Sequence, residues 1–224
     1  MSADAGFVVT AAGASARMGG ARKKEYRLLD GLPVLLHSIQ AAFRTGLFDR
    51  YVVVLPPGDE AVWYDELLPL LDNPCRDLVT LAPGGTSRQE SVFHALEALS
   101  GDPPEIVLIH DGARPWVSPD LIGRVYRKAR EKGACIPVVA LVDAPKRIGP
   151  TGEVVEHLDK HHLVGAQTPQ GFRFSLIYEA HRRFHDRLHL FPDDAALCHA
   201  AGIPVHTVEG DPVNRKITFP WDLP

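Results

Sequence analysis

Short apolar runs alternate with amphipathic segments along the first two thirds of this 224-residue chain. The apolar runs are nearly continuous, as in strands that are buried on both faces of a parallel sheet. They cover residues 7–11, 51–55, 78–81, 106–110 and 134–139. Helical periodicity between and after them predicts helices over residues 34–43, 61–71, 87–99, 119–132, 174–185 and 193–201, and a last strand over 204–208. This alternation predicts an α/β fold: a mostly parallel, twisted sheet with right-handed connections and helices on both faces.

Two of the predicted helices have clear start and stop signals. Ser87 and Glu90 have the spacing of a capping box at the start of the third helix. Ser118 is the predicted N-cap of the fourth helix, with Pro119 in its first turn and Gly133 as its stop. These signals predict the residue at which each of the two helices begins.

The pattern changes after Val142, where two short strand-like pieces flank the turn sequence "GPTG". We expect a hairpin arm at about residues 141–166, inserted in a single domain that spans residues 1–224. A lone two-stranded hairpin is marginal in water, and the apolar residues of this one need a cover: Ile148, Val154, Val155 and Leu158. The arm of a second subunit would supply it in a two-fold homodimer, and an arm folded back on its own domain is the alternative.

Composition and charge limit the class of protein. The formal net charge of −4 argues against a general nucleic-acid binder, so any positive site must be local. The three cysteines are scattered without a CxxC pair, which favours a reducing compartment over a disulfide framework or zinc knuckle. No basic region precedes the first apolar run and no run is long enough to span a membrane. We therefore expect a cytoplasmic protein without a membrane partner.

Four polar loops follow predicted strands, at the edge of the sheet where open α/β folds bind ligands. They are "AAGASARMGGARKKEY", "APGGTSRQES", "HDGARP" and "DPVNRK". The first carries Arg17, Arg22, Lys23 and Lys24 before its first acid, so it favours an anion. Its sequence does not match the GxGxxG pattern of dinucleotide-binding folds, the GxxxxGK[ST] pattern of P-loops or the GxSxG pattern of hydrolases. What remains is a nest of backbone N–H groups from residue 11 to 15 with Arg17 and Lys24 above it, which suits phosphate, or else a glycine-rich surface loop.

Other polar residues allow two interpretations. Asp111 ends a predicted buried strand and lies three residues before Arg114. The two residues form either a charged pair of the site or, separately, a capping acid and a surface base. His181, His185 and His189 have helical spacing, but without an evident ligand set we favour ordinary histidines over a metal site. We therefore predict no metal ligands among the side chains of this chain.

Five motifs in order and in register resemble one family: "AAGASARMGGARKKEY", "GGTSRQESV", "HDGARP", "QTPQGF" and "DPVNRKIT". The chain resembles the 2-C-methyl-D-erythritol 4-phosphate cytidylyltransferases of the non-mevalonate isoprenoid pathway over nearly its whole length. The resemblance implies a Rossmann-like domain with a projecting arm, a homodimer, and Mg²⁺ held mainly by the phosphates of CTP. It also implies transfer of CMP from CTP to 2-C-methyl-D-erythritol 4-phosphate, which yields 4-diphosphocytidyl-2-C-methyl-D-erythritol and pyrophosphate.

The resemblance also implies roles for individual residues. Arg17 and Lys24 match the pair that stabilises the transition state at the α-phosphate. Lys216 matches the lysine that positions the acceptor phosphate, and Lys160 takes the place of the arginine that orients the acceptor. The substrate-binding positions are the backbone of Ala11, Ala12 and Gly13 along the nucleotide; Gly85, Thr86 and Ser91 around the cytosine, with Arg88 as the arginine of that loop; and Asp111, Gly112 and Arg114 near the sugar phosphate, expected from the partner subunit.

Six positions depart from the family's pattern, three of them in the opening loop and three on the arm or later in the chain. They are Ser15, Lys23, Glu25, Ala144, Lys160 and Pro192. Two alternatives therefore stay open beside the erythritol enzyme. One is a cytidylyltransferase for another polyol phosphate, such as ribitol 5-phosphate, and the other is a nucleotide-binding module without turnover.

Overall fold

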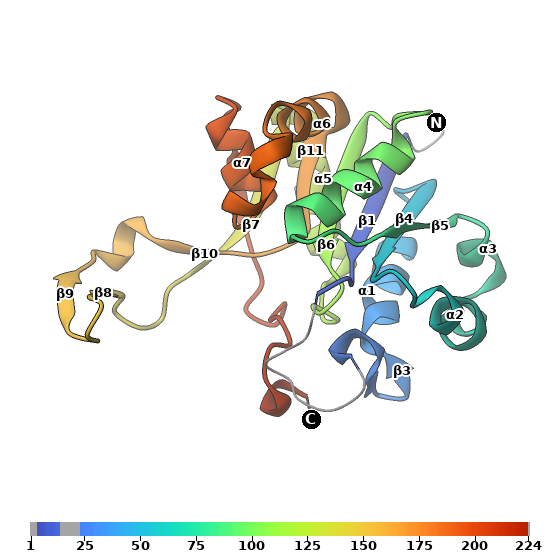
Figure 1. Ribbon diagram of the computed structural model, residues 1–224, viewed down its shortest axis with the longest axis horizontal. Helices are drawn as coiled ribbons and strands as arrows, with labels where there is room; N and C mark the ends of the chain where they lie inside the picture. The colour runs from blue at the N-terminus through green and yellow to red at the C-terminus, as the bar shows by residue number, and fades with distance from the viewer. Residues whose placement is uncertain (1–3, 14–22, 224) are drawn as a thin grey trace.

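An eight-stranded mixed sheet organises the molecule in a computed structural model that describes residues 4–13 and 23–223 (Figure 1). The strand order is β10-β7-β11-β6-β1-β4-β5, and β12 pairs with β7 beside this path. The strands are β1 (Ala5–Thr10), β4 (Arg50–Leu55), β5 (Val79–Pro83), β6 (Ile106–Asp111), β7 (Ala134–Ala140), β10 (Val164–Ala166), β11 (Gln170–Arg173) and β12 (His206–Glu209). The parallel pairs are β1 with β4 and β6, β4 with β5, and β12 with β7. The predicted mostly parallel sheet is confirmed.

Strand β11 was not predicted, and it separates β6 from β7 by pairing antiparallel to both. This strand of four residues is too short to show a period, and its first three residues are buried. Strand β10 is also antiparallel to β7.

Helices cover both faces of the sheet. Helices α1 (Val34–Phe43) and α5 (Pro119–Lys132) pack on one face, and α4 (Arg88–Leu99), α6 (Phe174–Arg183) and α7 (Asp194–Ala200) on the other. Strand β1 divides its side chains between the two cores: Phe7 and Val9 belong to the first, and Val8 to the second. This division follows from the two-residue period of a strand and explains why the run is apolar throughout.

The predicted helix signals work as expected in α4 and α5. The hydroxyl of Ser87 accepts the Glu90 N–H at 3.1 Å, and that of Ser118 accepts the Leu121 N–H at 3.2 Å. Gly133 ends α5 with φ of +92°, a backbone conformation that favours glycine. The N-terminus of α4 is therefore fixed close to strand β5.

The expected single helix over residues 61–71 is wrong in form. The segment consists of α2 (Glu60–Val62), the π turn η3 (Trp63–Leu67) and the 3₁₀ turn η4 (Leu68–Leu70), followed by α3 (Asn73–Arg76). Pro69 lies in η4, where it lacks the N–H that a continuing α-helix would need. Trp63 and Leu67 are nevertheless buried, so the apolar spacing indicated the inward face correctly.

Smaller elements connect these layers. They are η2 (Lys24–Tyr26), β2 (Leu28–Leu29), β3 (Leu32–Pro33), η6 (His185–Leu190) and η7 (Pro220–Asp222). Strands β2 and β3 form a tight hairpin whose turn residues, Asp30 and Gly31, both have positive φ. The hairpin leads directly into α1.

The arm projects sideways from the sheet, at the left of Figure 1. It consists of β8 (Lys146–Ile148), β9 (Val154–His157) and the turn η5 (Lys160–His162). Strand β10 already pairs in the main sheet, so the projecting part ends near Leu163. Ile148, Val154 and Val155 are 53–66% exposed, so the arm does not fold back to cover them on its own domain.

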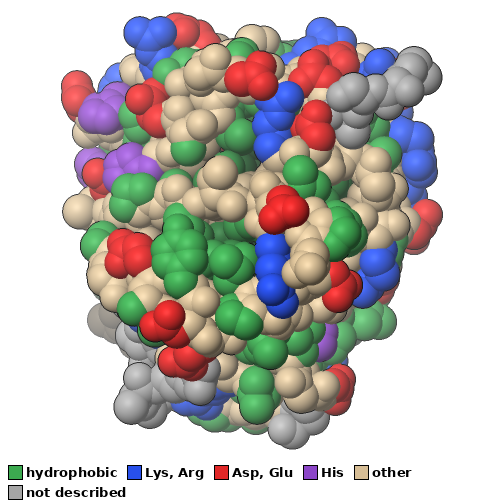
Figure 2. Space-filling view, turned by 90° about the vertical axis from the view of Figure 1, so that its right-hand side faces the viewer, with side chains coloured by type: hydrophobic (Ala, Val, Ile, Leu, Met, Phe, Trp, Pro, Cys, Tyr) green, Lys and Arg blue, Asp and Glu red, His purple; other side chains and the backbone are tan. Residues whose placement is uncertain are grey.

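The opposite edge of the molecule, near β5, carries charged side chains of both signs (Figure 2). Figure 2 shows the face near β5, α2 and α3, where acidic and basic side chains are interspersed. Within residues 4–13 and 23–223, no helix combines the length and apolar content that a membrane crossing requires.

Candidate active site

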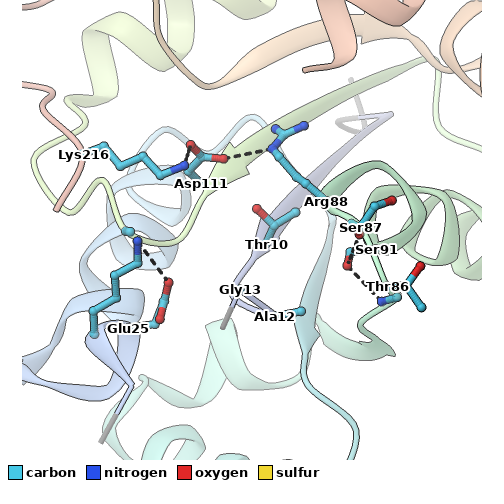
Figure 3. A pocket seen from close by; sticks show the side chains of 13 residues that line it. Thr10, Ala12, Gly13, Glu25, Thr86, Ser87, Arg88, Ser91, Asp111 and Lys216 are labelled. Atoms are coloured by element: carbon cyan, nitrogen blue, oxygen red, sulfur yellow. Dashed lines mark hydrogen bonds and ion pairs between the residues drawn. The ribbon is translucent and has the colours of Figure 1, made fainter. Parts of the chain in front are cut away.

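The four polar loops converge on one pocket of about 320 Å³ at the carboxyl ends of the central strands (Figure 3). Its lining comes from the ends of β1 and β6, from η2, from the start of α4 and from the segment after β12. The lining residues are Thr10, Ala12, Gly13, Lys24, Glu25, Gly85, Thr86, Ser87, Arg88, Ser91, Asp111, Ala113 and Lys216. The prediction that these loops share one site is confirmed.

Asp111 is the centre of the charged part of the pocket. Its Oδ2 lies 2.8 Å from Lys216 Nζ, and its Oδ1 accepts the Nε–H of Arg88 at 3.2 Å. Arg114 Nε is 3.7 Å from the same carboxylate. Burial alone would raise the pKa of Asp111, but Arg88, Lys216 and Arg114 together hold it well below its usual range. The carboxylate therefore stays ionised and aligned with its cations.

The backbone of Asp111 is fixed by a buried polar relay. Thr168 Oγ1 accepts the Asp111 N–H at 3.1 Å and lies 3.0 Å from His110 Nδ1. The other ring nitrogen of His110 faces the Arg114 carbonyl at 3.2 Å, so Nε2 carries the proton and the Thr168 hydroxyl donates to Nδ1. Burial lowers the pKa of His110 to about 4, which keeps the ring neutral.

Arg114 ties two loops together beneath the pocket. Its Nη1 donates to the Asn214 carbonyl at 2.8 Å, and its own carbonyl accepts the Ser38 hydroxyl at 3.1 Å. It does not line the pocket. Asp111 and Arg114 were expected to serve the site of a partner subunit, but Asp111 faces the pocket of its own chain because β6 ends there.

Lys24 reaches the pocket from η2. Its side chain is largely buried, and Nζ donates to the Ile217 carbonyl at 3.0 Å and lies 3.9 Å from a Glu25 oxygen. The turn itself is anchored by Tyr26, whose hydroxyl donates to Asp59 at 2.8 Å. The last segment of the chain therefore helps to hold Lys24 against the pocket.

The loop from β5 to α4 is held by its own side chains. Ser91 Oγ accepts the Gly85 N–H and donates to the Ser87 carbonyl, both at 2.9 Å. Glu90 accepts both the N–H and the hydroxyl of Thr86, at 2.6 and 2.5 Å. Gly85, Thr86 and Ser91 therefore form one rigid edge of the pocket.

Three glycines allow close packing around this edge. A Cβ on Gly84 would lie 2.4 Å from the Ala12 Cβ, and one on Gly85 would lie 2.4–2.7 Å from Glu90. A Cβ on Gly112 would lie 2.8 Å from a methyl of Leu35. The loops can approach β1 and α1 this closely only because these side chains are absent.

The structure places most of the predicted site residues in the pocket or directly behind it. Those that line the pocket are Ala12, Gly13, Lys24, Gly85, Thr86, Arg88, Ser91, Asp111 and Lys216. Ala11 and Gly112 lie just behind it, where their N–H groups donate to the carbonyls of Val54 and Thr10. Lys160 is exposed on the arm, where Nζ contacts the Val142 carbonyl at 3.3 Å, and Arg17 lies outside the described residues.

The sequence predicted Arg88 as the substrate-binding arginine of this loop, and the structure holds its guanidinium between two acids, Asp111 and Asp194. Sequence reasoning missed Thr10, Glu25, Ser87 and Ala113 in the lining. Thr10 could have been found as the polar last residue of a buried strand. Asp194 lies 106 residues from Arg88, and nothing in the local sequence pairs them.

The described residues contain no group of three or more His, Cys, Asp and Glu side chains placed to hold a metal ion. Glu25 and Asp111 are the carboxylates of the pocket lining. His181 is a core residue whose Nδ1–H donates to the Ile177 carbonyl at 3.0 Å, and its burial lowers its pKa.

Comparison with known proteins gives one family. The family model described as 2-C-methyl-D-erythritol 4-phosphate cytidylyltransferase (IspD) matches residues 6–224. The chain is 40% identical to the 2-C-methyl-D-erythritol 4-phosphate cytidylyltransferase of Pelotomaculum thermopropionicum, over 96% of this chain and 90% of that protein. It is 42% identical to the bifunctional enzyme IspD/IspF of Rhodopseudomonas palustris (strain BisB5), over 96% of this chain and 53% of that enzyme. The chain thus spans about half the length of the bifunctional relatives.

Solved structures agree with this assignment. The crystal structure of 4-diphosphocytidyl-2C-methyl-D-erythritol synthase from Anaerococcus prevotii has a TM-score of 0.83 at 28% identity, with 97% of this chain and 92% of that chain covered. The 2-C-methyl-D-erythritol 4-phosphate cytidylyltransferase of Thermus thermophilus has a TM-score of 0.76 at 32% identity, with 96% and 93% covered. The Rossmann-like interpretation of the sheet is confirmed.

Proposed function

This chain belongs to the 2-C-methyl-D-erythritol 4-phosphate cytidylyltransferase family, and we propose that it transfers CMP from CTP to 2-C-methyl-D-erythritol 4-phosphate. The products are 4-diphosphocytidyl-2-C-methyl-D-erythritol and pyrophosphate, and the reaction belongs to isoprenoid precursor biosynthesis. The observation that carries the proposal is the meeting of Lys24, Lys216 and the Gly85–Ser91 loop in one pocket.

The charges of the pocket suit a reaction between two anions. Among the described lining residues, Lys24, Arg88 and Lys216 are cations and Glu25 and Asp111 are acids, so positive charge is in excess. Gly85, Thr86 and Ser91 bring no charge to their edge of the pocket, which suits a flat base better than another phosphate. A nucleoside triphosphate fits this division, with its base at α4 and its phosphates toward Lys24.

The step itself needs no nucleophilic side chain. An oxygen of the acceptor phosphate bonds to the α-phosphorus of CTP as the bond from that phosphorus to the β-phosphate oxygen breaks, and pyrophosphate leaves with the electron pair. Repulsion and alignment set the barrier, so fixed positive charge at the reacting phosphates lowers it. We assign this charge to Lys24 and to Arg17, and the positioning of the acceptor phosphate to Lys216. Asp111 holds Lys216 in place.

A divalent cation, Mg²⁺, is part of the proposal. Mg²⁺ is commonly bound through substrate phosphates with at most one or two carboxylates. Glu25 lines the pocket, whereas both oxygens of Asp111 already face Arg88 and Lys216. When bound, the ion would neutralise charge on the triphosphate. The residues present fit an ion held mainly by CTP and do not form a cage of their own.

The dimer and the acceptor end rest on the arm. We propose that the exposed faces of Ile148, Val154 and Val155 pack on the arm of a second copy in a two-fold dimer. Lys160 lies at the return of this arm, where Nζ contacts the Val142 carbonyl, and would reach the acceptor phosphate across the interface as a point charge rather than a guanidinium fork. Three buried cysteines without disulfides support a reducing compartment, the cytoplasm.

Steady-state pyrophosphate release with CTP and a panel of polyol phosphates tests the function. We expect kcat/KM for 2-C-methyl-D-erythritol 4-phosphate to exceed that for ribitol 5-phosphate at least tenfold. The reverse order would assign the chain to another polyol phosphate. CTP binding without turnover on any acceptor would instead identify a nucleotide-binding module.

A further inference from the structure

Asp194 is a buried carboxylate that lies behind the pocket. It belongs to the first turn of α7, has no exposed surface and is absent from the pocket lining. Its Oδ2 accepts the Nη1–H of Arg88 at 2.8 Å, and its Oδ1 accepts the Nε2–H of Gln89 at 2.9 Å. A buried acid of this kind is stable only with such partners, so the charge of Asp194 is bound to Arg88.

Arg88 connects this acid to the pocket. While Nη1 contacts Asp194, Nε donates to Asp111 Oδ1 at 3.2 Å, and Asp111 Oδ2 holds Lys216 at 2.8 Å. Figure 3 shows the pocket end of this series, with Arg88 and Lys216 on either side of Asp111. Charges alternate in sign along it, and the planar guanidinium fixes the direction of each contact.

We propose that Asp194 is a positioning residue for Lys216, acting through Arg88 and Asp111. Asp194 holds Nη1 of the Arg88 guanidinium, Nη2 is buried without a hydrogen-bond partner among the described residues, and only Nε bonds Asp111, so one carboxylate oxygen remains for Lys216. Without Asp194, the guanidinium is free to bind both Asp111 oxygens, because paired N–H groups match a carboxylate. Lys216 then loses its anchor.

The sign of the effect separates this role from simple electrostatics. Removing the negative charge of Asp194 makes the region more positive, which by itself would tighten the binding of a phosphate. The positioning role predicts the opposite, because Lys216 without its anchor is misplaced, and a small misplacement of a positioning group can cost up to about a hundredfold. The kinetic part of this inference rests on the proposed function, so the test also needs a readout that is independent of turnover.

That readout is hydrogen exchange at the Arg88 Nε–H, followed by ¹⁵N NMR and assigned with Arg88→Lys. We expect slow exchange in the wild type and at least tenfold faster exchange in Asp194→Asn. Asp186→Asn is the matched control, because it makes the same acid-to-amide change at a side chain that is 99% exposed. If Asp194→Asn does not fold, Asp194→Glu replaces it, with the same direction expected.

The kinetic arm uses Asp194→Asn, Arg88→Met and the double variant. We expect Asp194→Asn to raise KM for the acceptor phosphate about tenfold with little change in KM for CTP, and the double variant to equal Arg88→Met alone. Three results would overturn the inference. They are a double variant in which the two KM effects multiply, a lower KM for the acceptor in Asp194→Asn, and unchanged hydrogen exchange at the Arg88 Nε–H in Asp194→Asn. No turnover in the wild type would instead defeat the proposed function, and the exchange measurement would still decide the role of Asp194.

Discussion

Lys216 Nζ lies 2.8 Å from Asp111 Oδ2, although the two residues are 105 positions apart in the sequence. Asp111 ends β6, and Lys216 follows β12 on the far side of β7. Their contact joins two loops that the sheet brings to the same edge. It leaves the lysine partly exposed to the pocket and the acid buried, so the cation faces the ligand and the acid fixes its position.

Lys216 and Lys24 should respond differently to the same substitution. Lys216→Met should raise KM for the acceptor phosphate, and Lys24→Met should lower kcat roughly a hundredfold through loss of charge stabilisation in the transition state. Steady-state kinetics with each substrate varied in turn separates the two effects. Lys132→Met, on the exposed last turn of α5, is the control. Near wild-type kcat in a folded Lys24→Met enzyme would remove Lys24 from the mechanism.

Gly85→Ala should damage recognition of the nucleotide base. The added Cβ would lie 2.4–2.7 Å from three carbons of Glu90, so that side chain must move and release Thr86. We expect KM for CTP to rise about tenfold, the loss typical of a displaced supporting residue, with KM for the acceptor unchanged. Gly101→Ala is the control, since a Cβ there meets nothing within 4 Å. A Gly85→Ala enzyme with unchanged KM for CTP would place the base elsewhere.

His110 should make the fold sensitive to acid. Its pKa is about 4 in the folded protein and near 6.5 in the unfolded chain, so the unfolded state binds a proton first as the pH falls. Stability is therefore full above pH 6.5 and falls between pH 6.5 and 4, by roughly 3 kcal/mol from this residue. Urea unfolding across this range should show a shallower fall in His110→Gln than in the wild type. Parallel curves would mean that His110 is protonated without cost in the fold.

The arm should control assembly. Val155→Asp places a charge on the exposed apolar face of β9, where the side chain is 54% exposed in one chain. Sedimentation velocity at micromolar protein should show a dimer for the wild type and a monomer for Val155→Asp, because burying an unpaired charge is costly. Thr151→Asp, in the turn of the arm, is the control. A monomeric wild type with full activity would rule out a role for the dimer.

Apolar periodicity and capping residues predicted the helices whose bounds depend on neighbouring residues in the sequence. Helix α1 has the bounds that its periodicity indicates, and Ser87 and Ser118 cap the helices that they were expected to begin. The short strand β11 could not be predicted, because its position between β6 and β7 depends on the path of the chain after the arm.

The same limit applies to the site. Loops at strand ends identified the pocket and most of its lining, including Lys24, Asp111 and Lys216. The partners of Arg88 could not be predicted, since Asp111 and Asp194 come from distant strands and helices that meet only in the fold. Motif matching assigned Arg88 to the loop after β5, but it could not show that packing turns the guanidinium toward two acids.

The central claim is that this pocket joins CMP to a polyol phosphate. Phosphorus-31 NMR of the wild-type enzyme with CTP, 2-C-methyl-D-erythritol 4-phosphate and Mg²⁺ tests it directly, since a diphosphodiester gives two coupled resonances. One equivalent of this diester is expected for each pyrophosphate released. CMP and pyrophosphate without the diester, or CTP that stays intact, would contradict it.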